Sequence, residues 1–550
     1  MPYTAAPAAA PVRLPTREAL LRRRRGWIFG LTGDEFVKFV FQGNAAISVV
    51  VLSLITFTIF RDAVDFLPQN RENLRIYRLA GLELVDLLRQ QVDDHKALSR
   101  YLGAIRQSEY ARLTGRLQLA PTEATRRLAT FDVFAERFTE TDIAQEALLG
   151  DMTELASGLK ERQKIAADLR EAKQNYLAAA RTADPARATT LRRQAEAIVV
   201  EEIDFAREIQ PLLARRADVA AGNARLLAAL SPIAASTPRL DDSVLQQRLE
   251  KFQRLAVAYI VGVPLTEKKM AGWDQSRPVT WLESFNAFAF GRDWVTASFW
   301  QDWYGILPLF TGTLLIAVLA LILAIPLGVA AAIYVNQVAT PVEQRLIKPG
   351  IEFISAIPSV VLGFFGIAVL GETLRRLSQL PALDWVPGFP ISERLNASTA
   401  ACLLALISIP TIFSLAEDAL NNVPRSFKEA SLALGATRLQ TVLRIIVPAA
   451  LSGITAAILL GFGRVIGETM VVLLCAGNRI EIPNLAAGLG VVFEPVHTMT
   501  GIIAQELGEV VRNTIHYRAL FMVGVVLFLL SLLINWLAQK IVRRYRLAPA

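Results

Sequence analysis

Long apolar runs, separated by polar and charged stretches, dominate the pattern of this chain. A helix that crosses about 30 Å of membrane hydrocarbon needs roughly 20 apolar residues. Segments that meet this requirement lie at about 39–60, 307–334, 351–370, 397–415, 447–474 and 519–537. The pattern therefore predicts an all-α membrane protein with six transmembrane helices.

Residues 61–300, between the first and second spans, follow a different pattern. Apolar residues recur there at near-helical spacing, with Arg, Glu, Asp and Gln between them. One such series is Ile76, Leu79, Leu82, Leu84, Leu87 and Leu88. Prolines break the pattern at Pro121, Pro185, Pro211, Pro232 and Pro238. We expect a coiled-coil-like bundle of long antiparallel helices, because a partly disordered spacer would contain fewer apolar residues.

Composition agrees with a membrane location. Of the 550 residues, 53% are hydrophobic and 20% are charged, and the mean hydropathy is +0.37. Cys402 and Cys475 both lie in apolar runs, which excludes a disulfide-stapled secreted domain. The net charge of +8 would fit a nucleic-acid-binding protein. However, the basic residues gather beside apolar runs, so we interpret them as orientation signals and expect no nucleic-acid partner.

The same basic residues predict the orientation of the chain. They precede the first span and follow the second, fourth and sixth spans, which places them all on one side of the membrane. They are Arg22 to Arg25, Arg345, Lys348, Arg425, Lys428, Arg438, Arg444, Lys540, Arg543, Arg544 and Arg546. Positive flanks stay in the cytoplasm, so we expect cytoplasmic termini at 1–38 and 541–550. Residues 61–300 are then an extracytoplasmic insertion, and residues 301–540 hold spans two to six.

Motifs for bound nucleotide or metal are missing from the sequence. No G-x-x-x-x-G-K-[ST] segment appears, so the chain has no P-loop of its own and is not expected to be an enzyme. His497 and His516 are far apart and have no accompanying ligands, so we expect no metal site. His95, the one histidine of the insertion, is expected to be a solvated surface residue.

A cytoplasmic loop after the fourth span contains the first informative motif. From Glu429 it reads EASLALGATRLQTVLRIIVP and ends at Pro448. Small and apolar residues from Ala430 to Leu434 predict a short helix, and Gly435 allows a sharp turn before a second helix that runs to Pro448. Such a helix-turn-helix would fit a groove on a soluble partner, although an ordinary interfacial loop has the same composition. The motif resembles the coupling sequence of ATP-binding-cassette (ABC) importer permeases, with Ser431 in place of the usual second alanine.

The second informative motif lies inside the fifth span and reads GFGRVIGETM from Gly461 to Met470. An Arg or a Glu at mid-membrane costs at least about 2.5 kcal/mol, so such residues normally face a polar path or each other. Arg464 and Glu468 are four residues apart, which predicts about 6 Å between them on one helical face. Gly463 and Gly467 form a small-xxx-small pair that would let another helix approach. The pair either lines an anion pathway or is a structural ion pair.

Together with three further segments, this motif resembles the PstC-type permeases of bacterial phosphate importers. The further segments are 288–294, 357–366 and 493–508. The resemblance implies a type I ABC importer permease of the bacterial inner membrane, with a substrate pathway at Arg464, Glu468 and Thr469. It also implies ATPase coupling through Glu429, Ala430, Ser431, Gly435 and Pro448. The insertion at 61–300 departs from the family, so its role is not implied.

Such permeases work in an assembly, and the resemblance implies the same partners here. They are a PstA-like permease, an ATPase dimer that binds the ATP, and an extracytoplasmic phosphate-binding protein. Another oxyanion such as sulfate or molybdate is the alternative substrate. A membrane sensor is a further alternative, because it shares the order of span, helical domain and span. Sensors continue into a large cytoplasmic domain, whereas this chain continues into four more spans.

Overall fold

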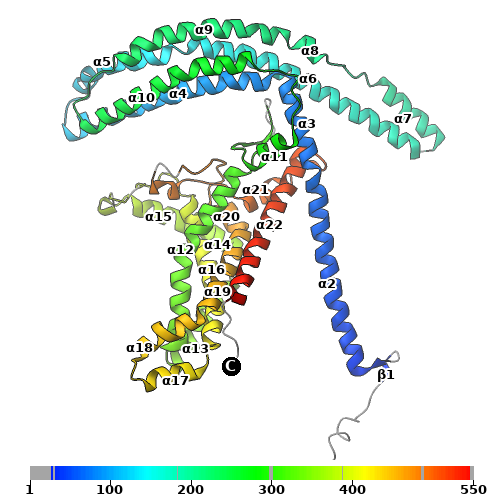
Figure 1. The fold of residues 1–550 in the computed structure, drawn as a ribbon, viewed down its shortest axis with the longest axis vertical. Helices are drawn as coiled ribbons and strands as arrows, with labels where there is room; N and C mark the ends of the chain where they lie inside the picture. Colours follow the sequence, from blue (N-terminus) through cyan, green and yellow to red (C-terminus); the bar gives the residue numbers. More distant parts are fainter. Residues whose placement is uncertain are drawn as a thin grey trace, which may run out of the picture.

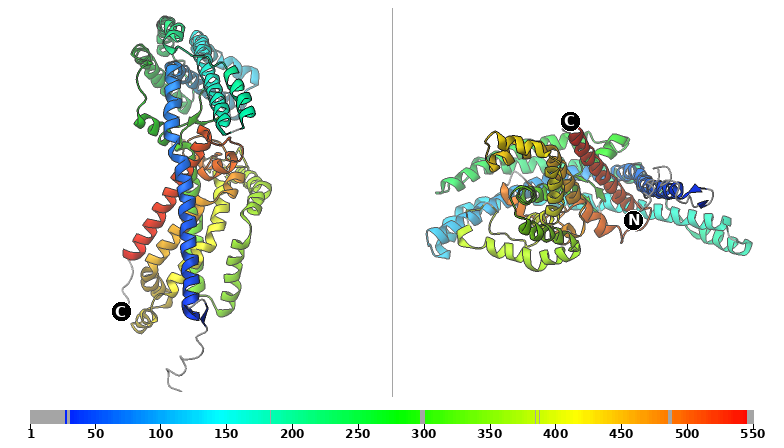
Figure 2. Two further views of the ribbon diagram at one scale, coloured as in Figure 1. Left: turned by 90° about the vertical axis from the view of Figure 1, so that its right-hand side faces the viewer. Right: turned by 90° about the horizontal axis from the view of Figure 1, so that it is seen from below.

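The computed structural model describes residues 27–28, 31–182, 184–296, 301–383, 385–386, 388–484 and 488–544. It has two parts, a stem of roughly parallel long helices and an arm that lies across one end of the stem (Figure 1). The side view shows the arm above the stem and both described chain ends at the opposite end (Figure 2). The arm is the insertion between the first two spans.

Five helices of the stem are long and apolar enough to cross a membrane. They are α2 (Gly33–Val64), α12 (Leu307–Gln337), α16 (Ala397–Asn421), α19 (Val447–Gly467) and α22 (Ile515–Arg544). Shorter stem elements are α17 (Arg425–Ala433), α18 (Arg438–Thr441), the π-helical η4 (Val442–Ile446), α20 (Met470–Cys475), η6 (Leu489–Phe493) and α21 (Met499–Glu506). The hydrophobic pattern thus located these spans, and the all-α fold is confirmed.

The third span differs from the prediction of one helix over 351–370. The chain forms α13 (Pro341–Ala356) and then, after a bend of 89°, a helix over 359–378. That second helix comprises α14 (Ser359–Phe365), η2 (Gly366–Leu370) and α15 (Gly371–Ser378), and the 3-10 turn η3 (Pro381–Leu383) follows. Pro358 explains the bend, because a residue before proline is driven out of the helical region, and Ile357 has ψ 124°. An ion pair between Lys348 and Glu417 ties α13 to α16.

Small residues bring α12, α16 and α19 together. A Cβ atom at Gly461 would lie 2.7 Å from Ile412 of α16, and one at Gly453 would lie 2.4 Å from Ala419. The predicted pair Gly463 and Gly467 does not make this contact. A Cβ at Gly463 would approach only Ile534 of α22, at 3.9 Å, and no described atom lies within 4 Å of the position at Gly467. The close packing therefore uses the neighbouring stripe of α19.

The first span stands apart from the rest of the stem. None of its most apolar window is buried within the chain, and its contact with α22 includes Phe60 edge-on to Phe528, with ring centroids 6.0 Å apart. Figure 1 shows α2 separated from the other stem helices along most of its length. Two short strands, β1 (Trp27–Ile28) and β2 (Leu31–Thr32), pair antiparallel immediately before α2.

The arm is a bundle of long antiparallel helices, as the sequence predicts. Its elements are α3 (Phe66–Leu79), α4 (Leu82–Ala111), η1 (Arg112–Arg116), α5 (Pro121–Glu140), α6 (Ile143–Thr182), α7 (Pro185–Ala197), α8 (Phe205–Glu208), α9 (Gln210–Ala235) and α10 (Ser243–Ala271). α11 (Trp281–Ala289) and the antiparallel pair β3 (Trp294–Val295) and β4 (Trp303–Tyr304) return the chain to the stem. Pro121, Pro185 and Pro211 stand in the first turns of helices, where a missing N–H costs little.

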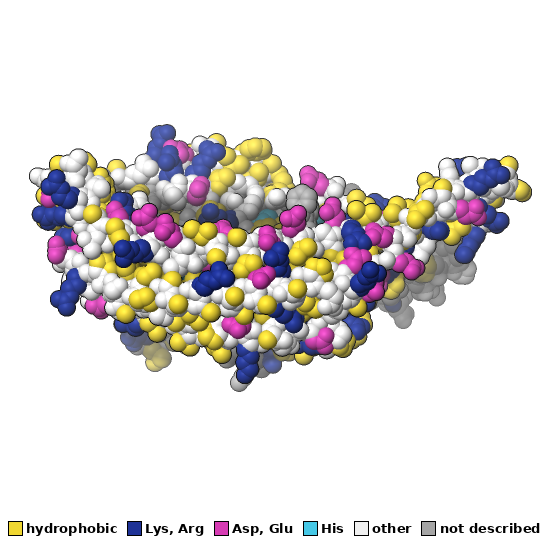
Figure 3. Space-filling view, turned by 90° about the horizontal axis from the view of Figure 1, so that it is seen from above, with side chains coloured by type: hydrophobic (Ala, Val, Ile, Leu, Met, Phe, Trp, Pro, Cys, Tyr) yellow, Lys and Arg dark blue, Asp and Glu magenta, His cyan; other side chains and the backbone are white. Residues whose placement is uncertain are grey.

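Large apolar side chains fill the core of the arm. Phe131, Phe138 and Phe252 are almost fully buried in one cluster, and Leu84, Leu88 and Met152 are buried in another. The upper face carries interspersed basic and acidic side chains, as a water-exposed surface does (Figure 3). His95 is the exception to our expectation, because it is 1% exposed rather than solvated. It stacks on the Phe138 ring with centroids 4.6 Å apart, an environment that periodicity in the sequence did not reveal.

Candidate functional site

The fifth span is interrupted at the segment that carries the predicted pathway residues. α19 ends at Gly467, Glu468 is extended with φ −73° and ψ 133°, and α20 starts at Met470. A continuous helix over 447–474 was therefore a wrong prediction. Thr500, at the start of α21, donates a hydrogen bond of 2.9 Å to the Glu468 carbonyl, which satisfies one backbone group that the break leaves free.

The break also separates the two charged residues. Arg464 is exposed on α19, and its Nη1 donates to Thr411 Oγ1 of α16 at 2.9 Å. Glu468 and Thr469 are half-buried in the unwound segment. Within the described part of the chain no ion pair joins Arg464 to Glu468, so the expectation of a pair on one helical face is not met. Thr411 was missed, and its only signal was a hydroxyl after Pro410 in an otherwise apolar run.

The arrangement can bind an anion at membrane depth. Non-helical backbone in the hydrocarbon region persists only where it is buried in protein or lines water. An arginine that faced lipid would cost at least about 2.5–3.5 kcal/mol. The exposed face of Arg464 is therefore one that a partner helix or an aqueous path must cover. A guanidinium with several free donors is suited to an oxyanion, and the Glu468 carboxylate in the unwound segment can accept a hydrogen bond from a protonated one.

Two of the segments that resemble the PstC-type family, 288–294 and 493–508, meet at the end of the stem nearest the arm. The Trp294 indole donates to Glu506 Oε2 at 3.3 Å, and His516 Nε2 lies 2.7 Å from the same oxygen. These contacts join β3, α21 and α22 next to a buried aromatic cluster that includes Phe288. Among the described residues no group of three or more His, Cys, Asp or Glu side chains could hold a metal ion.

At the other end of the stem, α17 and α18 form the predicted helix-turn-helix. The turn is a Schellman motif: Ala436 N–H donates to the Ser431 carbonyl at 3.2 Å, and Gly435 N–H donates to the Leu432 carbonyl at 3.0 Å. Gly435 has φ +85°, which glycine adopts without strain. Thr437 and Gln440 form a capping box that starts α18. The first helix is longer than expected, because it begins at Arg425 rather than near Ala430.

The tip of this motif is suited to a protein partner. Leu434 is 89% exposed and Leu439 is 66% exposed, and Glu429 and Ala430 are also on the surface. Ser431 is buried instead, and its hydroxyl lies 2.9 Å from the Thr441 hydroxyl, which fixes the angle between the two helices. A cavity of about 360 Å³ behind the tip is lined by residues that include Asn336, Asn421, Arg425, Lys428 and Glu429.

Pro448 does not end the second helix, contrary to the prediction. α18, η4 and α19 follow one another without a break, and Pro448 is the second residue of α19. The π-helical turn over 442–446 widens the helix just before Pro448. Proline has no backbone N–H, so it cannot donate the usual helical hydrogen bond to the carbonyl four residues earlier. The tip is therefore joined directly to the span that carries Arg464.

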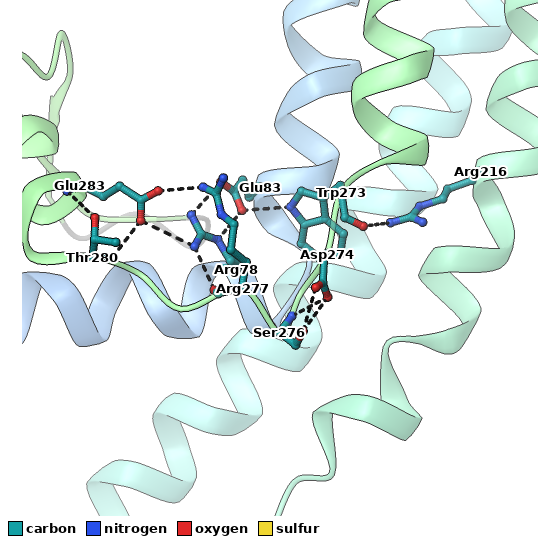
Figure 4. A network of polar contacts seen from close by, with 9 residues as sticks. All are labelled: Arg78, Glu83, Arg216, Trp273, Asp274, Ser276, Arg277, Thr280 and Glu283. Carbon is teal, nitrogen blue, oxygen red and sulfur yellow. Dashed lines mark hydrogen bonds and ion pairs between the residues drawn. The ribbon is translucent and has the colours of Figure 1, made fainter.

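A polar network fastens the beginning of the arm to its end (Figure 4). Arg78, at the end of α3, is 7% exposed and donates to both carboxylate oxygens of Glu83, at 2.7 and 3.1 Å. It also donates to the Arg277 carbonyl at 3.0 Å. The Trp273 indole donates to Glu83 at 2.9 Å. Burial raises the pKa of Glu83, but the bonds from Arg78 and Trp273 outweigh it and hold the pKa below its usual range. The chain segments that enter and leave the arm are thus fastened together.

Comparisons with known proteins agree with the geometry of the stem. Residues 324–547 match the family described as the binding-protein-dependent transport system inner membrane component. The probable ABC transporter permease YqgH of Bacillus subtilis is 33% identical over 241 residues, which are 43% of this chain and 72% of that protein. The phosphate transport system permease PstC of Haemophilus influenzae is 30% identical over 268 residues, which are 46% of this chain and 82% of the relative.

Two further similarities were found. PstC of Pasteurella multocida is 26% identical over 325 residues, 56% of this chain and 95% of the relative. Among solved structures, an inward-facing conformation of the MetNI methionine ABC transporter aligns over 44% of this chain and 95% of its own, with 20% identity and a TM-score of 0.32.

Proposed function

Because this chain belongs to the PstC-type permeases of the ABC importers, we propose that it forms one half of a membrane pathway that carries inorganic phosphate into the cell. One observation supports this most directly. Arg464, held by Thr411, presents a guanidinium at membrane depth beside the unwound segment at Glu468 and Thr469. Broken helices at mid-membrane are a recurring way to build substrate sites in transporters.

The same residues provide a basis for selecting phosphate. The guanidinium of Arg464 supplies charge and several donors to an oxyanion. Phosphate near neutral pH still carries a proton that it can donate to the Glu468 carboxylate, whereas sulfate carries none. Sulfate would therefore bring two unshared negative charges close to a carboxylate, and the site would disfavour it.

Transport requires further subunits in this proposal. A PstA-like permease completes the pathway and covers the exposed face of α19. A separate ATPase dimer binds ATP and receives the exposed tip at Leu434 and Leu439 in a surface groove. An extracytoplasmic phosphate-binding protein delivers the substrate. ATP-driven closure of the ATPase pair moves the tip, and the unbroken helix from α18 to α19 carries that movement toward Arg464.

The chain lies in the bacterial inner membrane with both termini in the cytoplasm, according to the same proposal. This orientation is supported by the direction of the end helices, because α2 begins and α22 ends on the side of the stem away from the arm, toward α17 and α18 (Figure 1). Basic residues also gather at this end, among them Arg425, Lys428 and Lys540.

Uptake of radiolabelled phosphate by cells that contain this chain and its partner subunits tests the proposed substrate. We expect phosphate to enter and unlabelled sulfate to leave the rate unchanged. Glu468→Gln should weaken this discrimination, whereas Glu481→Gln, which changes a side chain that is 71% exposed, should not. Saturation by sulfate or molybdate without phosphate entry would overturn the assignment of phosphate.

A further inference from the structure

A group of polar side chains is buried inside the arm, where the helices otherwise pack large apolar residues. Its members come from three helices and one turn, and we call them the arm chamber: Gln91 and His95 of α4, Asp142 between α5 and α6, Gln145 of α6, and Asn223 of α9. Each is at most 4% exposed. Nothing in the proposed transport cycle uses these residues.

Hydrogen bonds join three members of the arm chamber, and His95 contacts the end of α5 just before Asp142. Gln91 and Gln145 both donate to Asn223 Oδ1, at 2.8 and 2.7 Å. His95 Nε2 lies 3.0 Å from the Phe138 carbonyl, four residues before Asp142. Gly222 makes room for this arrangement, because a Cβ there would lie 2.9 Å from Gln145 Nε2.

Much of the hydrogen-bonding capacity of the chamber is unused. Among the described residues, six of its buried atoms have no partner: Gln91 Oε1, His95 Nδ1, both carboxylate oxygens of Asp142, Gln145 Oε1 and Asn223 Nδ2. A buried carboxylate without any donor is very unfavourable when it is charged. It is far less unfavourable when it carries a proton, so the geometry favours the neutral form of Asp142.

The surrounding charges do not reverse this preference. Charged or titratable groups around Asp142 are Asp93, Asp94, His95 and Lys96 of α4, Glu146 of α6 and Tyr259 of α10. α5 and α9 contribute Phe138 and Asn223. Lys96 is the nearest compensating cation, but its Nζ already pairs with Glu146 at 2.6 Å. Burial raises the pKa of the Asp142 carboxyl group to about 7, and the charges of Glu146 and Asp93 add to the effect.

Protons and water can reach the neighbourhood of the chamber from outside. A groove of about 580 Å³ between α4 and α10 is lined by Gln91 and Tyr259. Tyr259 is close enough to His95 for ring contact, with centroids 5.5 Å apart. The chamber is therefore buried but adjacent to an open surface feature.

We propose that Asp142 is a proton-binding site that controls packing within the arm: the junction of α5 and α6 is closed while the carboxyl group is neutral and opens when it ionises. In the closed chamber neither carboxylate oxygen of Asp142 accepts a hydrogen bond, so the charged form is not stabilised there. Opening of the junction exposes the carboxylate to water and lets Lys96 move toward it. The site responds to pH on the extracytoplasmic side if the orientation under the proposed function holds, because that orientation puts the arm there.

The direction of the pH effect follows from proton linkage. An exposed Asp142 in the opened junction ionises in the usual range of aspartate, whereas the closed junction keeps the proton up to a pH of about 7. The closed form therefore binds one more proton between these limits. As a result, the ratio of closed to opened junctions falls by about tenfold per pH unit up to pH 7. Above that pH both forms are ionised, and the equilibrium becomes independent of pH. His95 stays neutral in this window, because burial lowers its pKa to about 4.

Two measurements on the full-length protein in lipid nanodiscs test this proposal. The infrared difference spectrum between wild type and Asp142→Asn reports the neutral carboxyl group, and its band should disappear with a midpoint near pH 7. Hydrogen exchange of peptides over 138–148, corrected for the intrinsic rate at each pH, reports opening of the junction. Protection should fall by about tenfold per pH unit from pH 5 to 7 and then level off.

Matched variants separate the role of Asp142 from a general effect of pH. Asp142→Asn should keep the junction protected and remove the pH dependence of 138–148. Glu140→Gln changes an exposed carboxylate in the same peptides and should behave as wild type. A carboxyl band that is absent at pH 6, or protection whose pH dependence survives in Asp142→Asn, would overturn the proposal. Neither readout depends on transport, so the result is independent of the substrate.

Discussion

The stem and the arm bury their helices in opposite ways. In the stem, α16 and α19 approach at Gly453 and Gly461, where a single Cβ atom would collide with the neighbouring helix. In the arm, Phe131, Phe138 and Phe252 fill the space between helices. Water drives the burial of large apolar side chains in the arm. Lipid supplies no such force, so stem helices gain contact by close approach of their backbones.

Charged residues differ between the two regions for the same reason. Acidic and basic side chains of the arm lie largely on its surface, where some form pairs, such as Arg106 with Asp132 at 2.6 Å, and a surface pair contributes little to stability. A charge within a span is costly and persists where it has a task. We therefore expect loss of Arg464 to matter far more than loss of a surface arginine in the arm. The predictions below test this contrast.

The largest effect is expected from Arg464→Gln. This change removes the cation from the exposed face of α19, so we expect phosphate uptake to be abolished although the complex still assembles. Arg126→Gln in the arm is the matched control, because that side chain is 83% exposed and should be replaceable without loss. Uptake of labelled phosphate, normalised to assembled complex, is the measurement. Normal uptake by Arg464→Gln would remove the contrast between the two regions.

Gly435→Val, at the opposite end of the stem from the arm, should have nearly as large an effect. A β-branched residue is strained at φ +85°, so the turn between α17 and α18 would shift and the tip would no longer fit the ATPase. We expect uptake to be lost while membrane insertion is unchanged. Gly435→Asn is the control, since asparagine tolerates this conformation at a helix end. Undiminished pull-down of the ATPase by Gly435→Val would contradict the docking role of the tip.

Thr411→Val should have an intermediate effect. It removes the hydroxyl that accepts the 2.9 Å hydrogen bond from Arg464 but keeps the shape of the side chain. A hydrogen bond to a charged group contributes about 1.5–3 kcal/mol, so we expect uptake to fall by roughly ten- to a hundredfold. Thr411→Ser keeps the hydroxyl and should transport normally. Equal rates of phosphate uptake by the valine and serine variants would show that Arg464 does not need the hydrogen bond to Thr411 of α16.

The smallest effect on transport is expected from removal of the arm itself. Residues from about 70 to 275, which include Glu83 and Trp273 of the network, can be replaced by a short Gly/Ser linker, because that network shows that the two ends of the arm lie next to each other. All spans should still insert, since each carries its own hydrophobic signal. We expect uptake to be reduced or deregulated but retained. Complete loss of uptake in a well-inserted deletion variant would make the arm part of the transport mechanism.

The sequence was sufficient for features that depend on one segment at a time. Apolar runs located the spans, spacing of apolar residues predicted the helical arm, and Gly435 predicted a turn with positive φ. Each of these reflects a local preference or the match between a segment and its solvent. The motifs of the stem also indicated the PstC-type family, because its characteristic residues lie close together in sequence.

Only the tertiary structure decided features in which distant segments meet. Arg464 and Glu468 are four residues apart, yet the helix breaks at Gly467 and Arg464 binds Thr411 of another span. His95 and Asp142 look like surface residues in an amphipathic pattern, but helices far apart in the chain enclose them. The spacing of apolar residues shows which face of one helix is buried, but not which other helices pack against it. Which polar side chains are buried together depends on how several helices pack, and that is decided when all of them assemble.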